Sequence, residues 1–337
     1  MENNRKRVSI SVVHGDATEY ETDVLVLKYA QAHFGLDRTV SNKLIRLGVE
    51  ENEFAPEPGE SNFFHSRGGV KAKSVLVVGV TRLSEFSYKD IRICARAALE
   101  ALSEHEKDGA IEHVCFTMHG VQYGLDEIEA FESEIAGLID GITACRIPKS
   151  IEGISIIEID DRRAKSLGRA LSELIPLGYI ETNLKIYHET SAKYVHEKLR
   201  SVGYLSDDKP HMFVAMPFRE ELEDIYEYGI QNAVRKAGFI CERADLSAFT
   251  GDVVDWVKKR IRSASMLIAD LTGANPNVYL ELGYAWGVGV KTVLLTQEAE
   301  QLKFDVRGQR CLVYKRIEDL EEKLYKELVA LKDEIIN

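Results

Sequence analysis

One glutamate in the C-terminal part of the chain has a setting suited to nucleophilic chemistry. Glu281 follows Asn275–Asn277, in which an asparagine can cap a helix and Pro276 is tolerated in the first turn. Glu281 then lies about one turn into this helix, where the positive end of the helix dipole favours an ionised carboxylate. Asn277 and Tyr284 are spaced to share its face. An ionised glutamate at the rim of a pocket can attack an anomeric carbon.

Other candidate residues follow apolar runs that are typical of strands. Ligands of open α/β sheets bind outside the carboxyl ends of the strands. Asp270 closes one apolar run, and we expect it beside the nucleophile. The expected substrate-binding residues are Met216, Pro217, Phe218, Arg243, Asp245, Asn275, Asn277, Tyr284, Asp305 and Arg307. The structural alternatives are a solvated helix residue for Glu281, a turn cap for Asp270, and a surface ion pair for Asp305 with Arg307.

The elements that must position these residues alternate between strand and helix. Strands are expected at 211–216, 239–243, 266–270, 291–296 and 311–314, and helices at 220–237, 252–263, 277–287 and 317–335. In the third helix, Leu280 and Ala285 are expected to face the sheet. The repeated unit predicts a doubly wound, Rossmann- or flavodoxin-like parallel sheet over 210–337.

Three segments of this half carry a resemblance to a known family. FVAMPF, IADLTGANPNVYLELGYAWGVGVKTVLLT and KFDVRGQR resemble the nucleoside 2-deoxyribosyltransferase family and its TIR-like relatives. The resemblance implies that Glu281 attacks C1′ of a nucleoside, that the base leaves, and that Asp270 helps to handle the base. The transferases usually carry an aspartate where this chain has Asn275. TIR-like relatives split NAD, so NAD is an equally compatible substrate.

The N-terminal half contains glycine turns that suit a phosphate. Gly15 and Asp16 follow one strand-like run, and Gly120, Tyr123 and Gly124 follow another. Glycine lets the backbone approach a phosphate closely, and a following helix offers free N–H groups. Strands are expected at 8–13, 24–27, 74–80, 113–118 and 154–159, and helices at 88–105, 126–141 and 164–174. This rhythm predicts a sheet covered by helices over 1–180.

Two resemblances accompany these turns. Val12–Thr18 with Asp23–Val26, and Phe116–Leu125, resemble the opening and the diphosphate loop of a macro domain. This implies a macro-like α/β sandwich in which Gly15 and Asp16 meet an adenine. The segment 28–33 departs from the Asn- and Gly-rich loop of that family, which argues against ADP-ribose hydrolysis. The segment GGVKAKSVLVVGV is also similar to the aminopeptidase N-terminal domain, a macro-like fold without that site. Ligand sensing and a structural or oligomerising role both remain open.

Length, charge and composition restrict the kinds of protein that this chain can be. A length of 337 residues suggests two domains, with a linker over 181–209 that contains a helix at 191–202. Lys and Arg number 43 against 55 Asp and Glu, and the net charge of −12 disfavours extended nucleic-acid binding. The five cysteines lack zinc spacing and suit a reducing cytoplasm, and the histidines lack metal-ligand spacing, so no metal is expected. No apolar run reaches the roughly 20 residues that span a membrane.

The sequence therefore predicts a macro-like sensor or assembly module joined to a module that cleaves an N-glycosidic bond. The substrate is NAD or a nucleoside, and no cofactor is expected. This pairing resembles bacterial antiphage effectors, and the alternative is a non-catalytic nucleotide-binding regulator. We expect a homo-oligomer, because TIR-like domains often complete their sites with a neighbouring subunit. Leu320, Leu324, Leu328 and Leu331 form a stripe that serves either assembly or packing on its own sheet.

Overall fold

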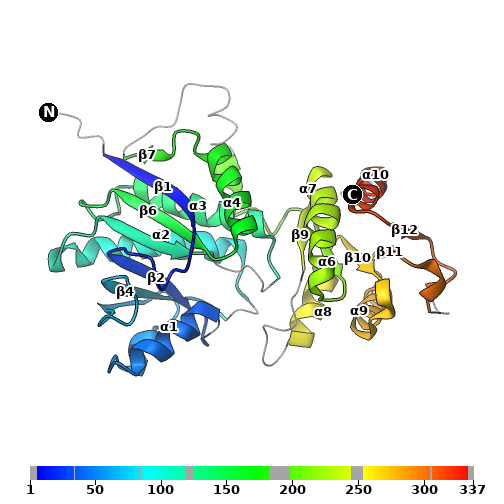
Figure 1. Cartoon of the computed structure of the whole chain (residues 1–337). Helices are drawn as coiled ribbons and strands as arrows, with labels where there is room; N and C mark the ends of the chain where they lie inside the picture. The colour runs from blue at the N-terminus through cyan, green and yellow to red at the C-terminus, as the bar shows by residue number, and fades with distance from the viewer. Residues whose placement is uncertain are drawn as a thin grey trace. The chain divides into compact units, whose positions relative to one another are not determined.

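The chain folds into two compact α/β units. The computed structural model describes residues 6–33, 35–82, 85–118, 124–182, 198–243, 253–303 and 306–332. The first unit comprises Met1–Val121 and Glu127–Asp207, and the second comprises Gln122–Asp126 and Asp208–Asn337. Each unit has its own sheet (Figure 1). The predicted fold class, two α/β domains, is confirmed. None of the described helices is long and apolar enough to cross a membrane.

The first unit is built on a seven-stranded sheet with the order β3-β4-β2-β5-β6-β1-β7. Its strands are β1 (Arg7–His14), β2 (Val24–Tyr29), β3 (Ser61–His65), β4 (Ser74–Gly79), β5 (His113–Thr117), β6 (Gly153–Glu158) and β7 (Tyr179–Glu181). The five inner strands pair in parallel, and the edge strands β3 and β7 pair antiparallel. The inner strands β4 and β6 are buried along their whole length, as expected for a parallel sheet covered on both faces.

Helices cover the first sheet. They are α1 (Gly35–Ile45), α2 (Tyr88–His105), α3 (Glu127–Thr143) and α4 (Asp161–Leu174), with short 3₁₀ turns η1 (Glu51–Phe54) and η2 (Glu106–Asp108). A capping box of Ser87 and Asp90 begins α2. A Cβ at Gly137 of α3 would lie 2.2 Å from the carbonyl oxygen of Arg92 in α2. Glycine is therefore what allows α2 and α3 to pack closely.

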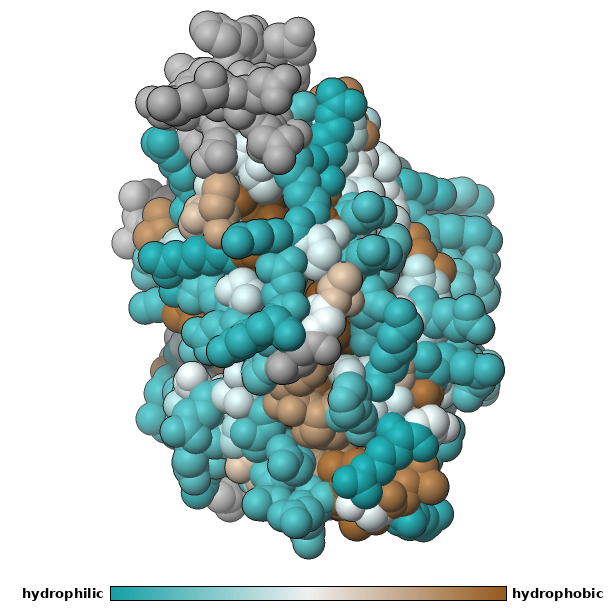
Figure 2. Space-filling model, turned by 90° about the vertical axis from the view of Figure 1, so that its left-hand side faces the viewer, coloured by the Kyte–Doolittle hydropathy of each residue, from teal (hydrophilic) through white to brown (hydrophobic). Residues whose placement is uncertain are grey.

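One face of the first unit is seen in a space-filling view. Figure 2 shows mostly hydrophilic side chains, with hydrophobic ones in separate patches between them.

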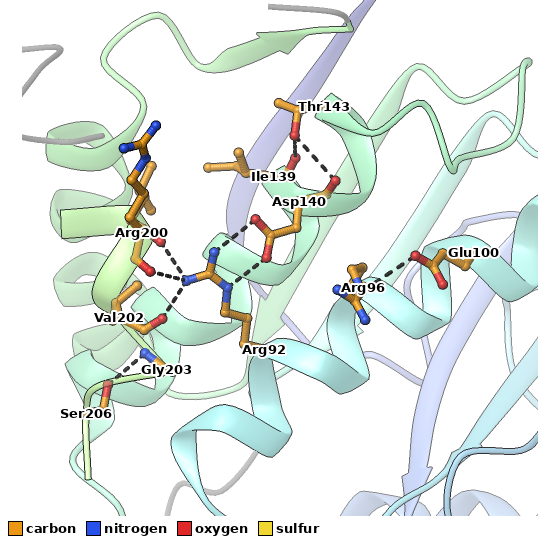
Figure 3. A network of polar contacts seen from close by, with 11 residues as sticks. Arg92, Arg96, Glu100, Ile139, Asp140, Thr143, Arg200, Val202, Gly203 and Ser206 are labelled. Atoms are coloured by element: carbon orange, nitrogen blue, oxygen red, sulfur yellow. Dashed lines mark hydrogen bonds and ion pairs between the residues drawn. The ribbon is translucent and has the colours of Figure 1, made fainter. Parts of the chain in front are cut away.

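The described end of the expected linker packs within the first unit. Residues 198–201 are helical, and the guanidinium of Arg92 donates from Nη1 to the carbonyl oxygens of Leu199 and Val202, at 2.6 and 2.7 Å (Figure 3). Its Nε and Nη2 donate to the two carboxylate oxygens of Asp140, at 2.7 and 2.9 Å. Residues 191–197 of the expected linker helix lie outside the described residues. The structure thus joins 198–207 to the first unit.

The second unit has a parallel five-stranded sheet with the order β12-β11-β10-β8-β9. Its strands are β8 (His211–Ala215), β9 (Ile240–Glu242), β10 (Met266–Asp270), β11 (Thr292–Thr296) and β12 (Cys311–Val313). If the five strands are renumbered 1 to 5 along the chain, from β8 to β12, their order from the β9 edge is 2-1-3-4-5. This is the flavodoxin-like order. At the edge strand β9, the backbone N–H of Cys241 donates to the carboxylate of Asp126, which also accepts from Arg235.

Two helical layers cover this second sheet. The elements are α6 (Glu220–Asp224), the π-helical η3 (Ile225–Gln231), α7 (Asn232–Lys236), α8 (Val253–Ser263), α9 (Pro276–Gly287) and α10 (Ile317–Ala330), with 3₁₀ turns η5 (Thr272–Ala274) and η6 (Ala299–Gln301). One core joins α6, η3, α7 and α10 to the sheet, and the other joins α8 and α9 to it. Leu320, Leu324 and Leu328 of α10 are fully buried in the first of these cores. These three leucines of the stripe therefore pack on their own sheet, and Leu331 packs against the same core while partly exposed.

Candidate functional site

The chain leaves the neighbouring strands β8 and β10 toward opposite faces of the second sheet. These strands are hydrogen-bonded neighbours, but the chain leaves β8 for the layer of α6 and leaves β10 for the opposite layer of α9. Such a topological switch point opens a crevice at the carboxyl ends of the strands, and ligands of doubly wound sheets bind there. The loops that follow Ala215 and Asp270 therefore form the candidate site.

Glu281 stands on the helix that leaves this switch point. The side chain of Asn275 caps α9 by accepting a 2.9 Å hydrogen bond from the backbone N–H of Asn277, as the sequence predicts. Glu281 is the sixth residue of α9 and is partly buried. Its carboxyl group makes no hydrogen bond or ion pair with the described residues, and burial raises its pKa to about 7. Burial thus opposes the ionised form that the position near the start of the helix was expected to favour.

The orientation of α9 follows from its apolar residues. Val278, Leu282 and Ala285 are buried against the sheet. Leu280 is 68% exposed, so the expectation that it faces the sheet is wrong, whereas Ala285 does face it. The spacing of Val278, Leu282 and Ala285 sets the helical phase and turns Leu280 outward. Glu281 lies next to Leu282 at the border of the buried face, which explains its desolvation.

Two other residues of α9, Asn277 and Tyr284, were also expected in the site. Asn277 is exposed. Tyr284 is partly buried, and its hydroxyl accepts a 2.7 Å hydrogen bond from Nη2 of Arg262 in α8. That bond ties α9 to α8 and holds the helix that carries Glu281.

Asp270 has a structural role at the end of β10. Its side chain is fully buried, and Oδ1 accepts hydrogen bonds from the backbone N–H and the hydroxyl of Thr272, at 2.9 and 2.6 Å. Oδ2 accepts a 2.6 Å hydrogen bond from the hydroxyl of Tyr314, whose pKa is raised by burial and by this carboxylate. Both oxygens are thus occupied within the protein. The expectation of a rim carboxylate that handles the base does not fit this placement, because Asp270 holds the loop that leads to α9.

At the ends of β8 and β9, residues that were expected to bind substrate contact one another. The guanidinium of Arg243 stacks 3.8 Å from the ring centroid of Tyr226 and lies 5.3 Å from that of Phe218. Its Nη2 donates a 2.8 Å hydrogen bond to Glu223, and its Nη1 lies 3.7 Å from Sδ of Met216. Met216 and Pro217 are buried, so Phe218 is the half-exposed member of the predicted MPF segment.

One residue that the sequence reasoning missed lies at the switch point. Arg219, directly after Phe218, is the N-cap residue of α6 and is exposed. Its Nη1 and Nη2 each lie 3.4 Å from the point that a Cβ on Gly273 would occupy. Gly273 belongs to the loop after β10 and has a φ of 71°, a conformation that favours glycine. The sequence signal that could have identified Arg219 is its position directly after the MPF segment that ends a predicted strand.

Of the remaining expected residues of the second unit, the structure describes Arg307. Arg307 is exposed and donates a 2.9 Å hydrogen bond from Nε to the carbonyl oxygen of Leu302. Asp245 and Asp305 lie outside the described residues. Within the described part of the chain, no group of three or more His, Cys, Asp or Glu side chains is arranged to hold a metal ion.

Of the expected N-terminal ligand residues, the structure describes Gly15, Asp16 and Gly124. Asp16 is exposed, and its Oδ1 accepts from the backbone N–H and hydroxyl of Thr18, at 2.8 and 2.9 Å, in the turn that Gly15 begins after β1. Gly120 and Tyr123 lie outside the described residues. Gly124 has a φ of 101° and belongs to the second unit, where a Cβ would lie 1.9 Å from the ring of Trp256. This placement gives Gly124 a packing role.

Comparisons with known proteins bear on the N-terminal half. Residues 28–133 match the family model of the cytosol aminopeptidase family, N-terminal domain, which is less than half of the chain. That range contains the GGVKAKSVLVVGV segment, whose resemblance to this domain the sequence already indicates. Among curated proteins, no sequence matches the chain.

Solved structures similar to this chain include macrodomains. The Trypanosoma brucei macrodomain in complex with ADP-ribose is 16% identical, with a TM-score of 0.39, over 48% of this chain and 69% of that chain. The Oceanobacillus iheyensis macrodomain with ADP is 14% identical, with a TM-score of 0.38, over 52% of this chain and 99% of that chain. At these TM-scores the similarity carries no argument about the ligand or activity of this chain.

Proposed function

We propose that the second unit cleaves an N-glycosidic bond, with Glu281 as the nucleophile. The observation that carries the proposal is the carboxyl group of Glu281, partly buried and without a partner among the described residues. It stands on the helix that leaves the switch point of the sheet, where doubly wound proteins bind ligands. A carboxyl group that is desolvated without being neutralised by a cation costs stability, which supports a functional reason for its position.

The chemistry follows from the ionised form of this group. The carboxylate of Glu281 forms a bond to C1′ while the bond from C1′ to the base nitrogen breaks, and its electron pair leaves with the base. Water, or a second base, then attacks C1′ of the glycosyl ester, and the bond from C1′ to the carboxylate oxygen breaks. The attacking water loses a proton to solvent. Water yields the free sugar, and a second base yields a transferred glycoside.

The surroundings of Asp270 bear on the leaving group. An ordinary nucleoside base leaves as an anion unless an acid protonates it, whereas the nicotinamide of NAD carries a positive charge and leaves neutral. Asp270 is fully buried and accepts hydrogen bonds at both oxygens, so it is not the acid. This favours NAD, or another N-glycoside with a cationic base, as the substrate, and NAD is then consumed and is not a cofactor.

We also propose that the first unit senses a nucleotide ligand and gates this reaction. The exposed Asp16 turn lies at the carboxyl end of β1, the edge at which a parallel sheet binds ligands. Adding ADP-ribose to the cleavage assay tests this part of the proposal. A rate that does not respond to ADP-ribose would leave the first unit with a structural or assembly role.

Base release by the full chain tests the proposed reaction. The chain is incubated with NAD and, separately, with deoxynucleosides, and chromatography detects the released base. Glu281→Gln keeps the size of the side chain and removes its charge, so it should abolish release. Glu318→Gln, an exposed glutamate near the start of α10, is the matched control and should release base at the wild-type rate. Wild-type turnover by Glu281→Gln would contradict the role of Glu281. No release from any substrate would favour a non-catalytic nucleotide-binding regulator.

A further inference from the structure

The two loops of the switch point approach each other through one arginine. The guanidinium of Arg219, after β8, lies against Gly273, after β10, with Nη1 and Nη2 at 3.4 Å and Cζ at 3.6 Å from the Cβ position of Gly273. These loops lead to opposite layers of helices, so a side chain that spans them lies over the crevice between β8 and β10.

The charge of Arg219 is not paired by the described residues. Arg219 makes no hydrogen bond or ion pair with the described residues, although the chain carries a net charge of −12. Two other arginines of this unit show the contrast: Arg243 pairs with Glu223, and Arg260 pairs with the fully buried Glu242. A guanidinium held at a ligand-binding edge without a carboxylate partner is suited to an anion from outside the chain.

Arg219 and Glu281 belong to the two segments that leave the switch point, after β8 and after β10. Burial is the cause of the raised pKa of Glu281, and no cation contributes to it, so Arg219 does not neutralise that carboxyl group. From Pro276 at the start of α9 to Glu281 the helix rises by about 7.5 Å. That rise is comparable to the span from the anomeric carbon of a ribose to its 5′-phosphate. One ligand can therefore present its anomeric carbon to Glu281 and an anionic group near the start of α9.

We propose that Arg219 binds a phosphate group of the substrate, so that the second unit acts on nucleotides or dinucleotides and discriminates against nucleosides. The planar guanidinium can donate two parallel hydrogen bonds to phosphate oxygens. Because Gly273 has no side chain, the loop beside Arg219 leaves room for a phosphate to reach the guanidinium. This inference rests on the proposed function, because it assigns the substrate class of the same site.

Three ligands with the same scissile bond test the inference on the full chain. NAD and nicotinamide mononucleotide carry phosphate, whereas nicotinamide riboside does not. Arg219→Gln should lower kcat/KM for both phosphorylated ligands by about tenfold, mainly through KM, because a charge-assisted contact is lost. It should leave the value for the riboside unchanged. Arg219→Lys should restore part of the loss, because lysine keeps the charge but not the paired donors.

The control is an arginine far from the carboxyl edge. Arg310 precedes β12, at the amino end of the strand, and pairs with Glu327 of α10. Arg310→Gln should change none of the three values. An equal loss for all three ligands in Arg219→Gln, or no loss for any, would overturn the inference.

Measurements of ligand binding distinguish a failure of this inference from a failure of the proposed reaction. Calorimetry with nicotinamide mononucleotide and the riboside compares the wild-type chain with Arg219→Gln. If the wild-type chain releases no nicotinamide but Arg219→Gln weakens only mononucleotide binding, the phosphate site stands and the glycosidase proposal fails. If the variant binds both ligands as the wild-type chain does, the phosphate site is wrong, whatever the activity.

Discussion

The hydroxyl of Tyr314 donates a 2.6 Å hydrogen bond to Oδ2 of Asp270, which joins the segment after β12 to the end of β10. Thr272 satisfies the other oxygen of Asp270, and the hydroxyl of Thr272 also accepts from the backbone N–H of Gln297 after β11. Three strand ends are thus held together by one buried carboxylate. This network fixes the loop from which α9 and Glu281 begin.

Removing the Tyr314 hydroxyl should destabilise the second unit without selective damage to catalysis. Tyr314→Phe leaves a buried carboxylate oxygen without its donor, which costs about 1–3 kcal/mol of unfolding free energy. In the background of Asp270→Asn the same change should cost less, because the two residues share one hydrogen bond. Denaturant unfolding of the four chains measures this coupling. A loss of base release in Asp270→Asn far beyond its loss of folded protein would instead restore a catalytic role to Asp270.

The strands of the second unit could be predicted well from the sequence. All five lie inside the expected ranges. Parallel strands that are buried on both faces, such as β8 and β10, form apolar runs. In the first unit, β3, β7 and α1 were not expected. The strand β3 lies at a sheet edge and is only half-buried, and β7 has three residues, so neither produces a long apolar run. The cap at Asn275 was predictable because it depends on neighbours in sequence.

The site was harder to predict where it depends on distant segments. The burial of Asp270 involves Tyr314, 44 residues away, and no local pattern around Asp270 indicates that partner. The position of Arg219 becomes informative only through Gly273, which belongs to another loop. The pKa of Glu281 depends on how α9 sits on the sheet, which the outward turn of Leu280 also reflects.

Glu281→Gln should stabilise the second unit at high pH. The pKa of Glu281 is about 7 in the folded chain against 4.5 for the ordinary group, so the folded chain binds this proton more tightly than the unfolded chain does. Its contribution to stability is complete below pH 4.5 and is lost as the pH rises through 7. The variant should therefore be more stable than the wild-type chain by up to about 3 kcal/mol at pH 8, and nearly equal to it at pH 4. Urea unfolding at the two pH values measures the difference, and a variant destabilised at pH 8 would contradict the unpaired, desolvated state.

The rate of base release should rise with pH through the same range. The nucleophile is the ionised form of Glu281, which predominates above a pKa of about 7. With a cationic leaving base no acid is needed, so kcat/KM for NAD should increase to a plateau at alkaline pH. Values of kcat/KM measured from pH 5 to 9 would show this rise and the plateau. A rate that falls as Glu281 ionises would indicate that its protonated form acts, as a general acid.

Arg92 should control the stability of the segment 198–206. Its buried guanidinium holds Asp140 and the carbonyl oxygens of Leu199 and Val202 (Figure 3). Arg92→Met leaves these groups without a donor and should cost about 3–5 kcal/mol, with faster hydrogen exchange at 198–206. The matched control is Arg96→Met, one turn further along α2, whose side chain is 38% exposed and pairs with Glu100. Equal effects of the two substitutions would show that the contact with 198–206 contributes nothing specific.

Gly124→Ala should destabilise the second unit through Trp256. A Cβ at Gly124 would lie 1.9 Å from Cη2 of the Trp256 ring, and the φ of 101° is strained for alanine. Trp256 is 6% exposed, so its ring cannot move without disturbing the core of α8 and α9. We expect a loss of about 2 kcal/mol or more and a shift in tryptophan fluorescence. In a Trp256→Leu background the cost of Gly124→Ala should fall, because the smaller side chain relieves the collision while the backbone strain remains. If Gly124→Ala instead left stability and fluorescence unchanged but abolished ADP-ribose binding, Gly124 would belong to the phosphate loop that the sequence suggests.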